Sequence, residues 1–519
     1  MKRTSGLLLH LTSLPSRFGV GDLGPEAERF AAFLARAGQR QWQILPLAPS
    51  SSFVGDSPYA GFSAFGGEPL LISPELLREE GLLDASELDK AAAAPGRSVN
   101  YALARAAKND LLRRAFARAE HGLLDDADFN GFLAANGHWA NDLALFLACK
   151  EHHAQAAWYD WPAPLRDRRD EALREYGEKL AREILFHKFC QHRFFRQWGR
   201  LRARLAEHGV ELVGDVPIYV THDSPDVWCN RALFKLDAEG RRTCVAGVPP
   251  DYFSKTGQRW GNPVFDWDAN QAQDFAWWTA RLLHHFGLHD QVRLDHFRGF
   301  AAYWEIPAEE RTAVRGRWVP APGSALLRTL RKRTGNPARL PILAENLGII
   351  TPDVEELRRE FDLPGMHVLQ FGFSPGAART PNAPFRHEPL GAVYTGTHDN
   401  NTTRGWFEQE LDAQGKKRLE RFVGSRVSAA DAPAALLRLA LASPAAQALV
   451  PAQDVLGLGP EARMNVPGLA EGNWSWRLLP GELHPSDEAA LADRLAEETI
   501  FYGRTGEDLE LGEYSPRHD

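Results

Sequence analysis

Short apolar runs recur along the whole chain, and helical patterns fill many of the segments between them. Runs of this length, bounded by turn residues, are typical of buried strands. Strands that alternate with helices form parallel sheets, and eight of them predict an α/β fold, a (β/α)8 TIM barrel spanning residues 1–519 as a single domain. The eight runs lie at 6–12, 41–47, 211–220, 291–297, 341–348, 366–373, 391–399 and 447–457.

Two of the helical patterns carry clear boundary signals. The segment 25–38 opens with Pro25 at a favoured first-turn position, has acidic residues in its first turn and stops at Gly38. The segment 351–361 begins with Thr351 as a predicted N-cap, followed by proline and acidic residues. Both segments are therefore predicted as helices that pack between consecutive strands.

The strands are unevenly spaced, which predicts two insertions. About residues 70–205 lie between the second and third strands and are rich in Ala, Leu, Arg and Glu, so we expect a large, mostly helical insertion. A second insertion, about 222–285, joins the third and fourth strands and contains VAGVPPDYFSKTGQRWGNPVFDW. We predict a long ordered loop there, at the C-terminal face of the barrel, and such loops are usually functional.

Composition and charge exclude several classes of protein. Apolar residues make up 44% of the chain, which excludes global disorder, and the net charge is −8. This charge argues against a partner nucleic acid or a basic membrane-surface protein. The four cysteines show no CxxC spacing, so neither a disulfide scaffold nor a structural zinc site is expected. No signal-peptide cleavage site or membrane-spanning run is evident, and we expect a cytoplasmic protein with no membrane partner.

Several tryptophans lie in stretches rich in Gly, Pro and Asn, which are typical of loops. These are Trp260, Trp406, Trp474 and Trp476. Aromatic rings on loops are candidates for stacking on sugar rings. The alternative, equally favoured for each one, is that the ring anchors its loop to the core.

Charged and polar residues recur where the predicted strands end. In QVRLDHFRGF, two charges stand two residues apart and therefore point to the same face of a strand. Because the carboxyl ends of barrel strands meet on one face, these side chains are expected to share a pocket. The residues are Asp215 after the third strand, Arg293 and Asp295 on the fourth, Glu345 after the fifth, and His398 and Asp399 after the seventh.

Each of these residues has a structural alternative. A strand-end Asp is often a helix cap. The alternative for the Arg–Asp pair is a structural ion pair, although burying such a pair is costly and is weak evidence for stability. The recurrence at four strand ends nevertheless favours a functional site. A metal site is the alternative chemistry, but the pairs His152–His153 and His284–His285 are adjacent within helical patterns and diverge around the helix. We interpret them as surface or core histidines.

The set suits cleavage of a glycosidic bond, which uses one ionised and one protonated carboxyl group. Arg293 favours the ionised form of Asp295, which makes Asp295 the candidate nucleophile. Glu345 has apolar neighbours in ILAENLG, which favours a raised pKa and a general-acid role. Asp399, with His398, is placed to grip sugar hydroxyls and to favour the distorted shape of the transition state.

An ordered series of motifs resembles one known family. The chain resembles the 4-α-glucanotransferases (amylomaltases or disproportionating enzymes), glycoside hydrolase family 77 of the α-amylase superfamily, over nearly its whole length. The motifs are HLTSLPSRFGVGDLG, ILPLAPSSSFVGDSPYAGFSAFGG, GDVPIYV, GVPPDYFSKTGQRWGNPVFDW, RLDHFRGF, AENLG, PGMHVLQF, YTGTHDNNTTRGW and RMNVPG followed by NWSWR.

The resemblance implies retaining transfer of α-1,4-glucan segments from a donor maltodextrin to the 4-hydroxyl of an acceptor, through a covalent glycosyl-aspartate. By analogy Asp295 attacks, Glu345 acts as acid and base, and Asp399 stabilises the transition state, with Asp295 and Glu345 about 5 Å apart. It implies no metal and no cofactor, maltooligosaccharides and α-1,4-glucans as partners, and cyclisation to cycloamylose as a further outcome. The oligomeric state is left open, with a monomer favoured. Substrate contacts carried over by resemblance are Ser57, Tyr59, Asp215, Gln258, Trp260, Arg293, His398 and Asn465.

One departure and two alternatives bear on this interpretation. Val54 stands where family members often have an aromatic, which weakens the case for a secondary glucan-binding contact. An amylase-like hydrolase on the same barrel shares the three carboxylates and is distinguished from a transferase by its products. A non-catalytic glucan-binding protein is disfavoured, because a degenerate barrel is expected to lose at least one of these carboxylates.

Overall fold

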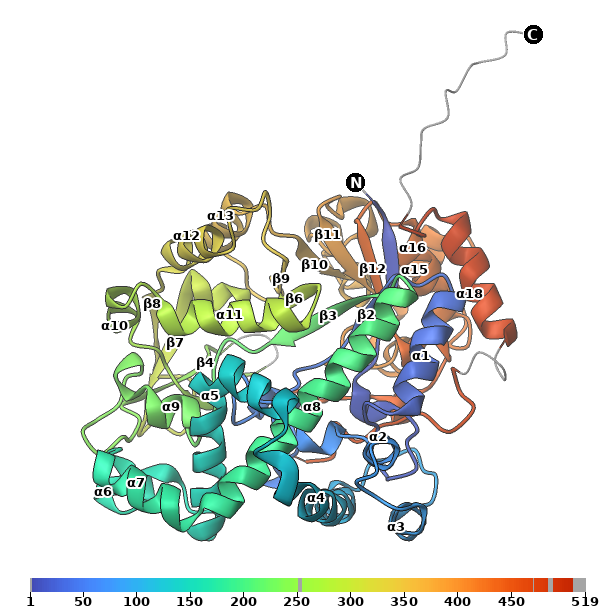
Figure 1. The fold of residues 1–519 in the computed structure, drawn as a ribbon. Coiled ribbons are helices and arrows are strands. Elements are labelled where there is room, and N and C mark those ends of the chain that lie inside the picture. Colours follow the sequence, from blue (N-terminus) through green and yellow to red (C-terminus); the bar gives the residue numbers. More distant parts are fainter. Residues whose placement is uncertain (1, 251–253, 470, 484–488, 507–519) are drawn as a thin grey trace.

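The structure, a computed structural model, describes residues 2–250, 254–469, 471–483 and 489–506. Eight parallel strands form one sheet in the order β10-β11-β12-β1-β2-β3-β6-β9. The outer strands β9 and β10 meet, because the N–H of Ala344 donates to the carbonyl of Pro364 at 2.9 Å. The sheet is therefore a barrel (Figure 1). Its strands are β1 (Thr4–Leu8), β2 (Gln41–Gln43), β3 (Glu211–Val216), β6 (Gln291–Leu294), β9 (Ile342–Ala344), β10 (Gly365–Val368), β11 (Gly391–Tyr394) and β12 (Gln447–Pro451).

Each predicted apolar run overlaps one of these strands, so the predicted barrel is confirmed. All eight strands end before the predicted run does. The last residues of β6, for example, are followed at once by a turn at Asp295. The second halves of the runs therefore leave the sheet at its C-terminal face, where they form loops that carry polar side chains.

Helices cover the outside of the barrel (Figure 1). Helix α1 (Pro25–Arg36) has the predicted Pro25 at its first turn and Glu26 and Glu28 behind it. Helix α13 (Pro352–Glu360) follows Thr351, but the hydroxyl of Thr351 makes no capping bond. That hydroxyl instead accepts a hydrogen bond from Arg298 at 3.2 Å, so the predicted cap is wrong in its side-chain contact. The other outer helices include α11 (Ala276–Leu288), α12 (Gly323–Arg333), α15 (Ala413–Val423), α16 (Ala432–Ala442) and α18 (Ala489–Phe501).

The segment between β2 and β3 is rich in helices, and they gather at one end of the barrel (Figure 1). The longest, α8, runs back to the barrel and leads directly into β3. The limits near residues 70 and 205 stay a prediction. The helices are α2 (Pro74–Glu79), α3 (Ala85–Ala91), α4 (Tyr101–Leu123), α5 (Ala127–His152), α6 (Ala163–Arg166), α7 (Asp170–Lys179) and α8 (Ala181–Glu207).

A second, antiparallel sheet of four strands lies beside the barrel, in the order β5-β4-β7-β8. Its strands are β4 (Cys244–Val248), β5 (Gln258–Pro263), β7 (Ala302–Pro307) and β8 (Arg317–Pro320). The predicted long loop is wrong here, because the stretch folds into the hairpin of β4 and β5. Its Gly- and Pro-rich composition hid the strands, and β4 gains its other partner from β7, which lies after β6 in the sequence. The limits of the predicted insertion at 222–285 stay a prediction.

Two further findings concern the chain as a whole. All four cysteines are free. Among the described residues, no helix has both the length and the apolar character needed to cross a bilayer.

Candidate active site

Arg293 lies at the centre of a cluster at the C-terminal face of the barrel. It is a register neighbour of Asp215 on the adjacent strand β3. One guanidinium nitrogen donates to both carboxylate oxygens of Asp215, at 2.9 and 2.7 Å, and the other terminal nitrogen donates to Oδ1 of Asp295 at 3.0 Å. Desolvation opposes the charge of Arg293, but Asp215 and Asp295 together raise its pKa well above the usual value. A permanently charged, buried Arg therefore fixes the orientation of Asp295.

Tyr59 joins this cluster from the loop that follows β2. Its hydroxyl donates to Oδ2 of Asp215 at 2.6 Å, and its ring stacks on His398 with centroids 5.0 Å apart. Ser57 caps the short turn that carries Tyr59, because its Oγ accepts the N–H of Tyr59 at 3.3 Å. Burial lowers the pKa of His398, which favours the neutral ring.

Glu345 follows β9 and is held by two backbone donors. Its Oε2 accepts the N–H of His296 at 2.8 Å, and its Oε1 accepts the N–H of Leu347 at 2.7 Å. Burial raises the pKa of Glu345 to about 7; Arg293 opposes this shift and Asp295 reinforces it. A carboxyl group with this pKa holds a proton near neutral pH and suits a general acid.

His296, next to Asp295, has a left-handed backbone conformation with φ 49° and ψ 50°. This turn aims its N–H at Glu345. The edge of its ring meets Trp260, with centroids 4.9 Å apart at nearly a right angle. Trp260 and Gln258 both lie on β5, where Nε1 of Trp260 donates to Oε1 of Gln258 at 3.1 Å. The second sheet therefore brings this pair to the side of the cluster formed by Asp295 and Glu345.

Asp399 lies in the loop after β11, with its side chain 45% exposed. Nδ2 of Asn465 donates to its Oδ1 at 2.6 Å, and Nε2 of His398 lies 3.4 Å from the same oxygen. The carbonyl of Asp399 accepts a hydrogen bond from Arg463 at 2.9 Å. Contacts from Arg463 and Asn465, in the loop after β12, therefore hold Asp399 and the loop after β11 in place.

Contacts thus link every residue predicted for the site. One hydrogen-bonded chain links Tyr59, Asp215, Arg293 and Asp295. Tyr59 connects this chain to His398, Asp399 and Asn465, and Ser57 caps the turn that carries Tyr59. His296, the residue after Asp295, connects the chain to Glu345, Trp260 and Gln258. The spacing of about 5 Å between the carboxyl groups of Asp295 and Glu345 stays a prediction.

The loop tryptophans divide between the two interpretations. Trp260 is 38% exposed and free to stack on a ligand, whereas Trp406, Trp474 and Trp476 are 5–7% exposed and anchor their loops. Trp474 packs 5.6 Å from Tyr59 and 6.0 Å from His398, measured between ring centroids. It therefore forms a wall behind the residues of the site.

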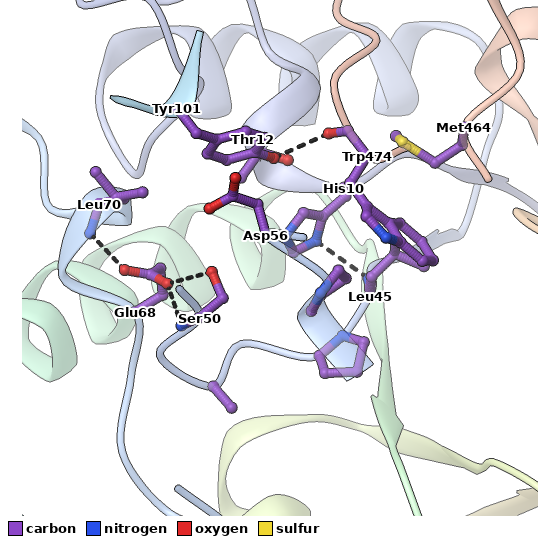
Figure 2. A pocket seen from close by; sticks show the side chains of 13 residues that line it. His10, Thr12, Leu45, Ser50, Asp56, Glu68, Leu70, Tyr101, Met464 and Trp474 are labelled. Carbon is purple, nitrogen blue, oxygen red and sulfur yellow. Dashed lines mark hydrogen bonds between the residues drawn. The ribbon is translucent and has the colours of Figure 1, made fainter. Parts of the chain in front are cut away.

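A small cavity lies behind this wall (Figure 2). Tyr101 donates to the carbonyl of Trp474 at 2.9 Å, and Nδ1 of His10 accepts the N–H of Leu45 at 3.3 Å. Burial, with a contribution from His398, lowers the pKa of His10 to about 3. The cavity measures about 20 Å³, which is room for one water molecule and too little for a sugar. The hydrogen bond from Tyr101, one of its lining residues, braces the Trp474 loop.

Two side chains near Asp399 were not predicted from the sequence, namely Arg463 and Glu410. Arg463 stands in the RMNVPG motif beside Asn465, which was the available signal. Glu410 closes a π-helical turn, Trp406–Glu410, and no pattern marks such a turn in advance. The histidine pair at 284 and 285 is structural, because both rings hydrogen-bond to carbonyl oxygens of Phe65 and Ala64. Among the described residues, no group of His, Cys, Asp and Glu is placed to hold a metal ion.

Comparisons with known proteins agree on one family. A family model described as 4-alpha-glucanotransferase matches residues 9–482. The 4-alpha-glucanotransferase of Thermus thermophilus is 48% identical over 503 residues, which cover 95% of this chain and 98% of that protein. The Synechocystis enzyme of the same name is 47% identical over 507 residues, which cover 97% of this chain and 98% of that protein.

A solved structure extends the agreement to three dimensions. The amylomaltase from Streptococcus agalactiae in complex with acarbose matches this structure with a TM-score of 0.90 and 36% identity, over 97% of this chain and 100% of that one. The fold, the motifs and the relatives all lead to the same assignment. The chain therefore belongs to the 4-α-glucanotransferase family, whose members are also known as amylomaltases.

Proposed function

We propose that this 4-α-glucanotransferase works by double displacement, with Asp295 as nucleophile, Glu345 as acid and base, and Asp399 as transition-state stabiliser. In the first step a carboxylate oxygen of Asp295 bonds to the anomeric carbon of the donor. The glycosidic bond breaks, and the proton of Glu345 passes to the leaving 4-oxygen. The result is a covalent glycosyl-aspartate and a shortened glucan.

In the second step an acceptor glucan takes the place of the leaving group. Glu345, now ionised, removes the proton of the acceptor 4-hydroxyl, and that oxygen attacks the anomeric carbon. The bond to Asp295 breaks, which restores the carboxylate and the protonated acid. A second α-1,4 linkage forms with retention, and an acceptor hydroxyl on the same glucan gives a cycloamylose.

The observation that carries this proposal is the contrast between two neighbouring carboxyl groups. Asp295 accepts a charge-assisted hydrogen bond from Arg293 at 3.0 Å, which orients its carboxyl group for attack. Glu345 is buried, and its pKa is raised to about 7. Carboxyl groups in such different environments are typical of a nucleophile and a general acid.

The substrates are expected to be maltooligosaccharides and longer α-1,4-glucans. The matched amylomaltase structure holds acarbose, and we infer that a related sugar chain lies across the same face here. We expect the sugar chain to contact Tyr59 and Asn465 and to lie over the buried side chains of Asp215, Arg293 and His398. Gln258 and Trp260 approach from the second sheet. The expectations of a cytoplasmic monomer without metal or cofactor stay predictions from the sequence.

Incubation with maltotriose tests the reaction class. Transfer yields glucose together with maltodextrins longer than maltotriose. The amylase-like alternative, which shares the same carboxylates, yields glucose and maltose alone. Accumulation of only these two products therefore excludes the proposed transfer.

A further inference from the structure

Arg463 occupies the junction between the loop that carries Asp399 and the loop that carries Asn465. We propose that Arg463 is a positioning residue for the reaction: it fixes the backbone of both loops so that the Asn465 amide keeps the Asp399 carboxylate aimed at the substrate. The proposal rests on the proposed role of Asp399 as transition-state stabiliser. The test below distinguishes a failure of the Arg463 proposal from a failure of the Asp399 role.

All three nitrogens of the Arg463 guanidinium have a partner. Nε donates to the carbonyl of Asn465 at 2.8 Å, and one terminal nitrogen donates to the carbonyl of Asp399 at 2.9 Å. The other terminal nitrogen donates to Oε1 of Glu410 at 3.2 Å. A planar fork with three fixed acceptors holds them at set angles, which a lysine ammonium does not do.

The carboxylate of Asp399 needs such support because it projects from a loop and is partly exposed. Asp399 lies five residues beyond the end of β11, outside any helix or strand, and its side chain is 45% exposed. Its Oδ1 accepts the hydrogen bond from Asn465 at 2.6 Å. Arg463 therefore fixes the carbonyl of Asp399 and the backbone of its amide partner at the same time.

Glu410 connects this arrangement back to the first loop. Its Oε1 also accepts a hydrogen bond from Nδ2 of Asn401 at 2.9 Å, and Asn401 follows Asp399 by two residues. The π-helical turn Trp406–Glu410 supplies this carboxylate, and such turns are frequent at functional sites. The Arg463–Glu410 pair is partly exposed, with side chains 22% and 44% accessible, so its ionic contribution to stability is small. The main effect of the Arg463–Glu410 pair is therefore to orient the guanidinium group of Arg463.

The experiment uses the full chain with maltotriose as substrate and compares Arg463→Gln and Arg463→Lys with the unmodified enzyme. We expect Arg463→Gln to lower kcat on the order of 10²-fold with KM within about twofold, since misplacement of a catalytic group affects the transition state more than the ground state. Arg463→Lys is expected to recover only part of the loss.

Arg231→Gln is the matched control for a merely structural role. Arg231 is 24% exposed and likewise joins a carboxylate, of Asp167, to a backbone carbonyl, of Ala238, far from the site. We expect Arg231→Gln and Arg463→Gln to change the thermal unfolding temperature by similar amounts. Of the two variants, only Arg231→Gln should keep a normal kcat.

An Asp399→Asn background completes the test. If Arg463 acts through Asp399, Arg463→Gln adds less than about twofold to the loss that Asp399→Asn causes, because groups that act as a unit are not additive. A normal kcat in Arg463→Gln overturns the positioning role. So does a double variant whose loss of kcat is the product of the two single losses. In both cases the role of Asp399 stands. Full activity of Asp399→Asn overturns the role of Asp399 itself.

Discussion

The backbone N–H of His296 donates to Oε2 of Glu345 at 2.8 Å, so the residue that follows the proposed nucleophile holds the proposed acid. His296 reaches this position through its left-handed backbone conformation. The loops after β6 and β9 are thereby tied together. Movement of one carboxyl group relative to the other is restricted before any substrate binds, which is the preorganisation that catalysis needs.

Activity is expected to fall as the pH rises through about 7. Burial raises the pKa of Glu345 to about 7, and above that pH the carboxylate has no proton to give to the leaving oxygen. A pH profile of kcat/KM for maltotriose measures this directly. Glu345→Gln should lower kcat by at least 10²-fold and remove this alkaline limb, and a variant that keeps the limb contradicts the assignment.

The same pKa shift predicts a change in stability. The folded enzyme keeps the Glu345 proton between its ordinary pKa of 4.5 and about 7, where the unfolded chain has lost it. The free energy of unfolding therefore decreases as the pH rises through this window. Because an amide in place of this carboxyl group does not titrate, Glu345→Gln should be more stable than the unmodified enzyme above pH 7, by up to about 3 kcal/mol. Denaturant unfolding of both proteins at pH 5 and pH 8 measures the difference in their unfolding free energies. The same difference at both pH values would contradict the prediction.

Arg293→Lys should reduce kcat on the order of 10²-fold. A lysine keeps the charge, but its single ammonium group does not bind both oxygens of Asp215 and Oδ1 of Asp295 at once. Arg358→Lys is the matched control, because Arg358 is equally buried and donates to Glu355 and Glu388, neither of which is among the residues predicted for the site. Both variants should lose comparable unfolding free energy, but only Arg293→Lys should lose kcat.

Tyr59→Phe tests the hydrogen bond to Asp215. It removes a 2.6 Å bond to a buried carboxylate, and hydrogen bonds to charged groups contribute about 1.5–3 kcal/mol. We expect kcat/KM to fall by about 10- to 100-fold on this basis. Tyr303→Phe, whose hydroxyl lies 3.4 Å from Glu305 in the second sheet, serves as control. An unchanged kcat/KM in Tyr59→Phe would show that the bond has no part in catalysis.

Trp260→Ala tests whether the second sheet contributes to sugar binding. Loss of an exposed stacking ring is expected to raise KM for maltotriose by about 3- to 10-fold, in line with about 0.5–1.5 kcal/mol for an aromatic contact. Trp318→Ala on β8 is the control, because both tryptophans are 38% exposed on the same sheet. Equal KM changes in the two variants would remove Trp260 from the site.

The sequence indicated the barrel and much of its site because both depend on local patterns. Apolar runs marked the strands, and Arg293 and Asp295 stood out because two charges interrupted such a run. The second sheet was missed because β4 pairs with β7, and neither strand has an apolar pattern strong enough to show alone. Arg463 was missed because its partner Asp399 lies 64 residues away, and only folded loops bring them together.

Trp474 shows a similar limit. Its neighbours in the sequence predict a loop but leave open whether the ring faces solvent or core. Contacts of the ring with Tyr59 and His398, which lie on other loops, answer this question. The hydrogen bond from Tyr101 of α4 to the Trp474 carbonyl then holds the loop in place. Long-range packing therefore determined which loop aromatics remained exposed.

The central claim is that Asp295 forms the covalent bond to the sugar. The most direct measurement is mass spectrometry of the enzyme after reaction with 5-fluoro-α-glucosyl fluoride, which slows the second step, followed by sequencing of the labelled peptide. We expect one added fluoroglucosyl group on Asp295, and no label in Asp295→Asn. A label on another residue, or turnover of the reagent by Asp295→Asn at the unmodified rate, would contradict it.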